Sequence, residues 1–227
     1  MLQNFIDIIA APTAALARIK QAPSFWLPMV LLIALAMSTQ LGYFLHNKPG
    51  FVRDEIIQQA TAGRNLTKEQ TKQIEDTMSK LNINAAAGAS TGAVLIIVPI
   101  VLCLMAWYLG FMAKFSFSEL TFGHWLALQC WTTVPSMFGA IAVWLVLLTD
   151  TTGMVGQSDL QPLSIASLLG VKLNSPTLQQ FSVLQLWSTI LTVFGYQQWT
   201  KVSWLNSTII VLAPTVIIYG AIFYFTN

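Results

Sequence analysis

The sequence predicts an all-α, polytopic integral membrane protein with five transmembrane helices. Two observations lead to this prediction. First, 55% of the 227 residues are hydrophobic and only 9% are charged, a balance typical of membrane proteins. Second, uncharged apolar runs of about 18 residues or more, long enough to cross a bilayer as a helix, occur at residues 25–45, 92–113, 125–148, 181–199 and 204–225. An odd number of spans places the two termini on opposite sides of the membrane.

The predicted spans differ in strength. The span at residues 181–199 is the weakest on hydropathy, because Gln185, Ser188 and Thr189 interrupt it. A proline inside a helix removes one backbone hydrogen bond and kinks the chain. Such kinks are expected in three other spans, at Pro99, Pro135 and Pro214.

Residues 1–24 are predicted to form a pair of short helices that lie in the membrane interface. They do not resemble a cleaved signal peptide, because Asp7 comes first and the apolar run begins only near residue 25. Apolar residues recur at helical spacing, and Pro12 suits the start of a helix. We expect the apolar side to face the membrane, with Arg18 and Lys20 toward anionic headgroups.

Residues 46–90 hold most of the charge of the chain and are predicted to form a helical hairpin outside the membrane. Residues 51–60 are compatible with a helix. A second helix is expected after Thr67, because the sequence from Thr67 to Gln70 has the pattern of a capping box.

The second helix of this hairpin carries a narrow apolar stripe formed by Ile74, Met78 and Leu81. A stripe this narrow cannot fill a core by itself. It rests either on the first half of the hairpin, through Val52 and Ile56, or on another protein. The sequence leaves both alternatives open, and we favour the second.

The loop at residues 149–180 is predicted to contain another interfacial helix. Its leucines between Leu160 and Leu169 indicate an apolar face, and Asp159 is a candidate N-cap. With this loop, the whole chain from residue 1 to residue 227 forms a single membrane domain.

The sequence carries no motif of a soluble enzyme: it lacks a phosphate-binding loop, a His-Glu-x-x-His motif, a Gly-x-Ser-x-Gly motif and a Cys-x-x-Cys motif. No predicted span contains an ionisable residue in its interior, where intramembrane enzymes and ion-coupled carriers need one. We therefore expect no catalytic residue, no cofactor, no metal and no nucleic-acid partner. The nearest ionisable candidates lie at span ends or in short loops: His46, Lys114, Glu119, His124 and Asp150.

The distribution of basic residues does not settle which side of the membrane each loop occupies. A count of basic residues places the hairpin in the cytoplasm, because six of them lie between the first two spans. Those six are balanced by nearby acidic residues, whereas Arg18, Lys20, Lys114 and Lys201 mark short segments on the other side. The charge count alone leaves the orientation open.

Three stretches of the sequence resemble the Yip1 domain family. They are PSFW at residues 23–26, FSFSELTFGHWLALQCWTTVPSMFGAI at residues 115–141, and FSVLQLWSTILTVFGYQQWTKVS at residues 181–203. In that family one helix carries an aromatic residue and then a proline, here Trp131 and Pro135. The next span carries a tryptophan and then a glycine, here Trp187 and Gly195.

The resemblance implies a non-enzymatic protein with five spans and a cytoplasmic N-terminus. The chain lacks the long N-terminal tail of eukaryotic members, and Pro23, Phe25 and Trp26 only approximate their fuller motif. It therefore resembles the prokaryotic branch, which implies a bacterial inner membrane and no Rab-type partner.

Two functions are compatible with this sequence. The first, which we favour, is a scaffold or accessory subunit that binds another integral membrane protein, such as a transport complex, besides membrane lipids. The second is a transporter or channel for a lipid or small amphiphile. Oligomerisation stays open. The candidate partner-contact residues are Ile74, Met78, Leu81, Phe25, Trp26, Trp131, Pro135, Trp187 and Gly195.

Overall fold

The structure is a computed structural model that describes residues 2–61, 67–170 and 181–226, and in these ranges it is helical without a strand. This confirms the predicted all-α class. The helices, with the 3-10 turn η1, are α1 (Leu2–Ala10), α2 (Pro12–Gln21), α3 (Trp26–His46), α4 (Pro49–Thr61), α5 (Lys68–Ser79), α6 (Ile83–Lys114), α7 (Phe122–Thr132), η1 (Val134–Ser136), α8 (Met137–Thr149), α9 (Ile165–Leu169), α11 (Val183–Thr200) and α12 (Trp204–Thr226).

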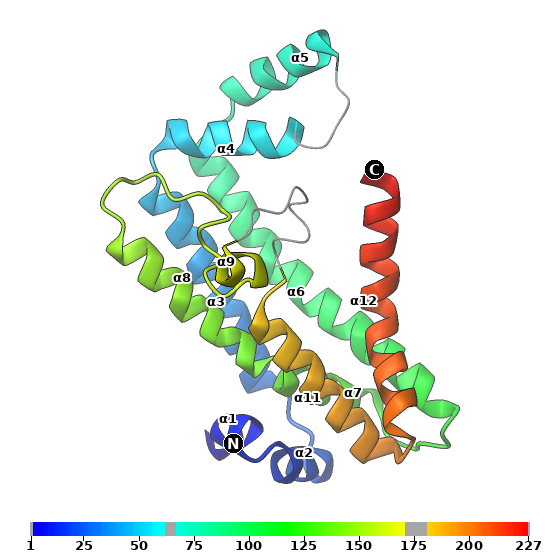
Figure 1. Cartoon of the computed structure of the whole chain (residues 1–227). Coiled ribbons are helices and arrows are strands. Elements are labelled where there is room, and N and C mark those ends of the chain that lie inside the picture. The colour runs from blue at the N-terminus through cyan, green and yellow to red at the C-terminus, as the bar shows by residue number, and fades with distance from the viewer. Residues whose placement is uncertain (1, 62–66, 171–180, 227) are drawn as a thin grey trace.

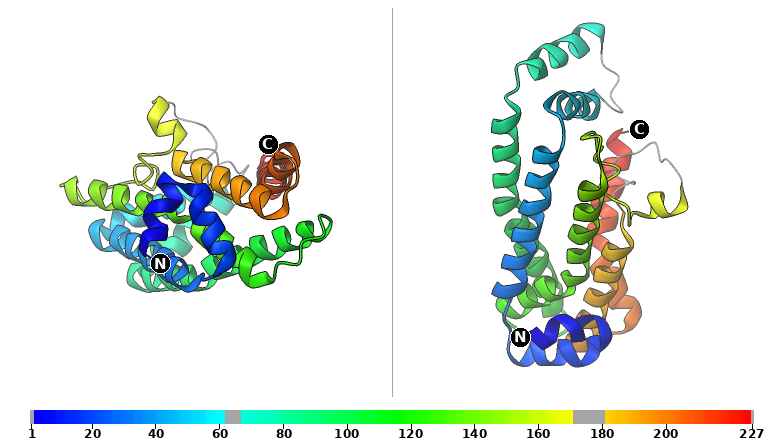
Figure 2. Two further views of the ribbon diagram at one scale, coloured as in Figure 1. Left: turned by 90° about the horizontal axis from the view of Figure 1, so that it is seen from below. Right: turned by 90° about the vertical axis from the view of Figure 1, so that its left-hand side faces the viewer.

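Long helices form the body of the molecule, with α3 packed between α6 and α8, and α11 packed beside α12. The chain begins at one end of this bundle, below α3, and ends at the opposite end with α12 (Figure 1). The side view of Figure 2 shows α1 and α2 at one end and α4 and α5 at the other. The bundle thus has two distinct ends joined by its apolar middle.

Four segments in the described ranges are long and apolar enough to cross a membrane: Trp26–His46, Ile83–Lys114, Phe122–Thr149 and Trp204–Ala221. They correspond to four of the five predicted spans. The remaining one, residues 181–199, folds as α11, whose 18 residues extend about 27 Å, slightly less than a hydrocarbon core of about 30 Å. The fifth crossing therefore stays a prediction.

Pro135 interrupts the third apolar segment as predicted. Here the 3-10 turn η1 separates α7 from α8. Thr133 Oγ1 donates to the Gln129 carbonyl at 2.6 Å, and Ser136 Oγ donates to the Thr133 carbonyl at 2.6 Å. These side-chain bonds hold the turn together on both sides of a proline that offers no N–H. By contrast, α6 and α12 continue past Pro99 and Pro214.

The main core lies where α7 and α11 meet the N-terminal helices. Its largest buried side chains include Trp125, Trp131 and Tyr196, each at most 1% exposed. The rings of Trp125 and Tyr196 pack with centroids 5.5 Å apart. The contact between Trp125 and Tyr196 joins α7 to α11 through two large buried rings.

The prediction for the N-terminal segment was partly wrong. Two short helices do form, and α2 begins at Pro12. However, Ile8, Leu16 and Ile19 are buried in the main core rather than turned toward lipid. From below, α1 and α2 cross the end of the bundle (Figure 2). The sequence could not indicate this, because an apolar helix face looks the same whether protein or lipid covers it.

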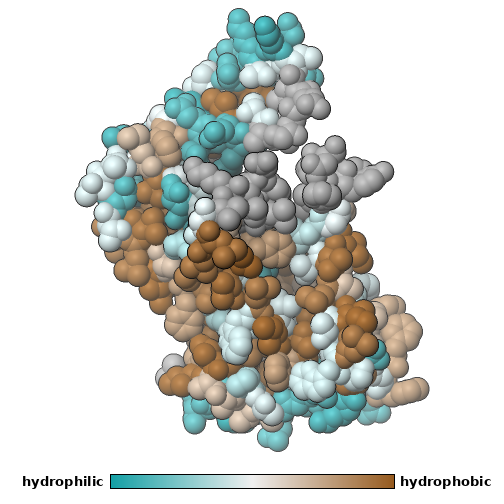
Figure 3. Space-filling view, viewed as in Figure 1, coloured by the Kyte–Doolittle hydropathy of each residue, from teal (hydrophilic) through white to brown (hydrophobic). Residues whose placement is uncertain are grey.

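The region between α3 and α6 forms two helices that pack against each other, α4 and α5, which we call the α4–α5 arm. The predicted capping box is confirmed: Thr67 Oγ1 accepts from Gln70 N at 3.2 Å, and Gln70 Oε1 accepts from Thr67 N at 2.9 Å. Figure 3 shows this end as the most hydrophilic part of the visible face. Its place outside the membrane stays a prediction.

The short helix predicted in the loop after α8 starts later than expected. It is α9, and its N-cap is Ser164, whose Oγ accepts from Ser167 N at 3.1 Å. The predicted cap, Asp159, instead accepts from Gly156 N within a turn. The later start is explained by Pro162, because the residue before a proline is disfavoured in the helical conformation. The remainder of this loop, residues 171–180, lies outside the described residues.

Candidate functional site

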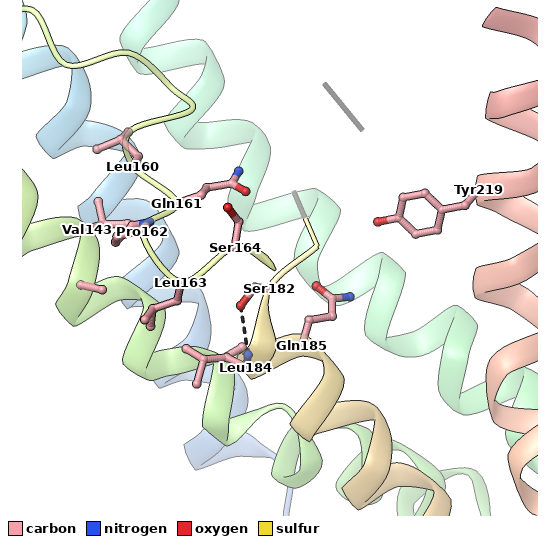
Figure 4. A pocket seen from close by; sticks show the side chains of 13 residues that line it. Val143, Leu160, Gln161, Pro162, Leu163, Ser164, Ser182, Leu184, Gln185 and Tyr219 are labelled. Carbon is pink, nitrogen blue, oxygen red and sulfur yellow. Dashed lines mark hydrogen bonds between the residues drawn. The ribbon is translucent and has the colours of Figure 1, made fainter. Parts of the chain in front are cut away.

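A pocket of about 340 Å³ lies beside the start of α11, bounded by the first half of α8, the segment before α9 and one residue of α12. Figure 4 shows side chains from these elements turned toward a common space. The polar side chains that line it are Ser136, Gln161, Ser164, Ser182, Gln185 and Tyr219. Leu160, Leu163 and Leu184 supply apolar parts of the wall.

Backbone pairing holds the wall of this pocket together. Ile165 N donates to the Phe181 carbonyl at 2.8 Å, and Val183 N donates to the Leu163 carbonyl at 3.1 Å. These bonds flank an isolated antiparallel bridge between Ser164 and Ser182. The segment before α9 is therefore tied to the start of α11, although the two are distant in sequence.

The start of α11 lies beside the first turn of α8. A Cβ atom added at Gly139 would lie 3.7 Å from Leu184 Cδ1. Non-helical backbone is tolerated at membrane depth only where protein buries it or where it lines a cavity. The paired backbone at Ser164 and Ser182 lines the same pocket as Gly139 of the third apolar segment.

The described lining of the pocket carries no charged residue. Its donors and acceptors are amides and hydroxyl groups, and no described residue hydrogen-bonds the side-chain amides of Gln161 or Gln185. The hydroxyl of Tyr219 points toward the space in Figure 4, and its ring packs on Phe181 with centroids 4.4 Å apart. Such a site can recognise an uncharged polar group.

A polar junction connects the end of α3 to the end of α8. His46 Nε2 lies 2.7 Å from Asp150 Oδ2, and the same carboxylate oxygen accepts from Gly153 N at 2.8 Å. The hydrogen bond with His46 is the main cause that lowers the pKa of Asp150 below its usual value; bonds from Thr152 also lower it. The sequence identified His46 and Asp150 separately but not as a pair.

Asn47, which follows α3, and Glu55 of α4 bind the loop after this junction. Asn47 Oδ1 accepts from Val155 N at 2.6 Å, while Asn47 Nδ2 donates to the Val155 carbonyl at 3.2 Å. Glu55 Oε2 accepts from Gln157 N at 3.1 Å. A single asparagine thus saturates both backbone groups of one loop residue, which fixes the loop after α8 against the base of the α4–α5 arm.

The opposite end of the bundle is held by tryptophan side chains and one lysine. Trp131 Nε1 donates to the Ser24 carbonyl at 2.7 Å, and Trp199 Nε1 donates to the Leu16 carbonyl at 3.1 Å. Lys20 Nζ donates to the Trp199 carbonyl at 3.1 Å. Arg18 pairs with Asp7. Lys20 therefore has a structural partner at the end of α11, and the headgroup role expected for it stays a prediction.

The remaining ionisable candidates stay apart from one another. His124 closes a capping box at the start of α7, where its Nδ1 lies 2.8 Å from Thr121 Oγ1. Lys114 ends α6, and Glu119 lies in the following loop. Within the described residues, no group of three or more His, Cys, Asp or Glu residues is arranged to hold a metal ion.

The structure divides the predicted partner-contact residues into two groups. Trp131, Pro135 and Gly195 are buried inside the chain, where they pack helices together. The others retain exposed surface or lie at half-buried positions. This second group consists of Phe25, Trp26, Ile74, Met78, Leu81 and Trp187.

Within the second group, Trp26 is 64% exposed at the start of α3, and Trp187 is 38% exposed on α11. Leu81 packs against a small cluster that contains Tyr43, Val52 and Ile83. Thus Leu81, one member of the predicted stripe, packs on the first half of the arm. This agrees with the alternative in which the stripe is internal packing. Ile74 and Met78 lie farther along α5 and are only half-buried.

These helices, with wide apolar faces exposed along α3, α6 and α12, define a helical integral membrane protein. A family model for the Yip1 domain matches residues 6–225, so the chain belongs to the Yip1 domain family. This confirms the resemblance carried by the three sequence stretches. No curated protein matches the chain, and no solved structure matches it.

Proposed function

We propose that this protein is a non-enzymatic scaffold or accessory subunit that binds another integral membrane protein, such as a transport complex. One observation carries the proposal. Helix α5, at the outer end of the α4–α5 arm, packs mainly against α4 and leaves Ile74 and Met78 half-buried. An apolar stripe on a charged helix that has one main neighbour is suited to binding a second protein.

The setting of the arm supports this role. Asp54, Glu55 and Glu75 line a groove between α4 and α5 together with Phe51 and Ile57. Acidic groups around an apolar contact favour a partner with basic groups and disfavour wrong partners. The membership of the Yip1 domain family supports a role in the membrane.

In this proposal the chain crosses a bacterial inner membrane five times, with α11 as the fourth crossing and the N-terminus in the cytoplasm. The positions of the termini at opposite ends of the bundle (Figure 1) support an odd number of crossings. The α4–α5 arm then lies on the side opposite to the N-terminus. A partner is expected to present a surface just outside the membrane on that side.

The proposal is tested by mild-detergent co-purification from the native source with the double variant Ile74→Glu/Met78→Glu. We expect unchanged thermal stability and loss of the membrane protein that accompanies the wild type. The control Gln73→Glu/Thr77→Glu adds the same charge at exposed positions of the same helix and should retain the partner. If the test variant instead lowers stability and keeps its partner, the stripe is internal packing.

The pocket beside α11 favours a second candidate function, a transporter or channel for a lipid or small amphiphile. A transported amphiphile does not require buried charge, and the described lining of the pocket has none. Reconstitution into liposomes separates the two functions. A transporter moves a fluorescent lipid between leaflets when purified alone, whereas a scaffold leaves the rate at that of protein-free liposomes.

A further inference from the structure

We infer that the pocket beside the start of α11 binds an uncharged lipid headgroup, that of a diacylglycerol. Its lining belongs to α8, the segment before α9, α11 and α12, so the site does not involve the α4–α5 arm. The inference goes beyond the proposed functions because it requires neither a protein partner nor movement across the membrane.

The chemistry of the lining selects the headgroup. Gln161, Gln185 and Tyr219 present amide and hydroxyl groups to the same space (Figure 4). Together they can donate to ester carbonyls and accept from a hydroxyl group, the two kinds of polar group in a diacylglycerol head. A phosphate headgroup is disfavoured, because phosphate recognition uses Arg or Lys and the described lining has neither.

The size of the pocket points to a headgroup rather than a whole lipid. A volume of about 340 Å³ lies at the small end of ligand pockets, which span roughly 300–1,000 Å³. The glycerol head and its ester groups must enter, while the acyl chains stay outside. The site therefore needs an apolar surface at its mouth.

Such a surface is present around the pocket. Leu168 and Leu169 of α9 are 57% and 70% exposed. Leu186, next to Gln185, and Ile218, next to Tyr219, are also exposed. Acyl chains lying on these side chains bury apolar area and stay in contact with the hydrocarbon core.

The location at membrane depth strengthens the argument. The pocket reaches Gly139, Ala142 and Val143 of α8, inside an apolar segment suited to crossing the membrane. Amide and hydroxyl groups in contact with hydrocarbon are costly without partners, and the amides of Gln161 and Gln185 and the hydroxyl of Tyr219 line this pocket. A lipid headgroup supplies those partners and enters sideways from the bilayer, without passing through the packed core.

Photolabelling tests the inference with the full chain in nanodiscs. The probe is a diacylglycerol that carries a diazirine near the ester end of one acyl chain, and labelled peptides are mapped by mass spectrometry. We expect labels on α8, α11 and α12 near Gly139, Gln185 and Tyr219. Unlabelled diacylglycerol should compete, and phosphatidylglycerol at the same concentration should not. Equal competition by both lipids, or labels spread over all apolar faces, would show ordinary lipid contact and overturn the inference.

Two glycine variants provide a matched pair. Gly139→Leu projects a side chain from the pocket wall, whereas a Cβ atom at Gly220 meets nothing within 4 Å. We expect labelling to fall about tenfold in Gly139→Leu and to stay unchanged in Gly220→Leu. Undiminished labelling in a folded Gly139→Leu variant would contradict the inference. If the Gly139→Leu variant unfolds, Gln185→Leu, at an exposed position, replaces it in the same experiment. Labelling of Gln185→Leu must then be lower than labelling of the wild type.

Discussion

Gly195 of α11 lies against Leu128 of α7 so closely that a Cβ atom at position 195 would come within 2.3 Å of Leu128 Cδ1. The same Cβ atom would lie 3.2 Å from Leu16 Cδ2 of α2. Both leucines are completely buried. The missing side chain of Gly195 therefore permits three elements to meet: the N-terminal helix pair, α7 and α11. Small residues have this role at many helix contacts in membranes.

We predict that Gly195→Ala lowers the free energy of unfolding by about 1–3 kcal/mol, the usual cost of overpacking a core. Thermal unfolding in detergent measures the change. Gly88→Ala and Gly92→Ala are the controls, because a Cβ atom at either position meets nothing within 4 Å. These two should be neutral or slightly stabilising, since alanine favours a helix more than glycine does. Equal stability of Gly195→Ala and the wild type would show that Leu128 moves aside at little cost.

The N-terminal helices are expected to detach when Trp199 loses its donor. Trp199→Phe removes the hydrogen bond from Nε1 to the Leu16 carbonyl, which costs about 0.5–1.5 kcal/mol. Limited proteolysis should then cut between α2 and α3, near Pro23, faster than in the wild type. Trp204→Phe, at a side chain that is 51% exposed, should leave the cleavage rate unchanged. Equal rates for both variants would contradict this role of Trp199.

The junction of His46 and Asp150 makes stability dependent on acid pH. In the folded protein the pKa of Asp150 is lowered, chiefly by the hydrogen bond with His46. In the unfolded chain an aspartate has a pKa of about 3.9. The stability that the ionised carboxylate contributes is therefore complete above about pH 4 and is lost as the pH falls toward the lower folded-state pKa.

We predict that Asp150→Asn lowers Tm at about pH 5 and that the difference from the wild type shrinks as the pH falls below about 4. Thermal unfolding over this pH range measures it. His46→Gln should reduce the effect, because it removes the main cause of the lowered pKa. A difference that is independent of pH down to strongly acidic conditions would show that Asp150 acts only through its shape.

The number of membrane crossings can be measured by cysteine labelling in a Cys103→Ala/Cys130→Ala background. We expect Glu69→Cys, on α5, and Asn227→Cys to react with an impermeant reagent in intact cells. Gln3→Cys should react only after permeabilisation. If Asn227→Cys instead reacts only after permeabilisation, as Gln3→Cys does, the two termini lie on the same side of the membrane. That result would show that α11 does not cross the membrane.

Local signals in the sequence predicted local structure well. The capping box at Thr67 and the start of α2 at Pro12 were both correct, because each depends on atoms within one helical turn. The break at Pro135 was correct for the same reason. Hydropathy located four of the predicted spans, since burial in lipid requires a long apolar run.

What the sequence did not predict depends on residues far apart in the chain. His46 and Asp150 are separated by 104 positions, and nothing local to either one indicates the other. A partial signal existed, because both residues end spans that leave the membrane on the same side. The burial of Ile8, Leu16 and Ile19 was missed because the periodicity of a helix does not identify what covers its apolar face.

The pocket beside α11 was also beyond reach of the sequence alone. Its lining comes from separate elements between Ser136 and Tyr219. Ser164 and Ser182 are neighbours through an isolated antiparallel bridge, which no local pattern in the sequence indicates. Weak hydropathy near Gln185 was visible in the sequence, and in the structure this part of α11 borders a pocket that has both polar and apolar side chains in its wall.

The most direct test of the proposed partner surface is site-specific photocrosslinking in intact cells of the native source. A photoreactive amino acid replaces Met78, on the half-buried face of α5, or Gln73, at an exposed position of the same helix. We predict that position 78 forms one discrete adduct with an integral membrane protein and that position 73 forms little adduct. The adduct at position 78 should be lost when Ile74→Glu is added. Absence of any adduct at position 78, or equal adducts at both positions, would contradict it.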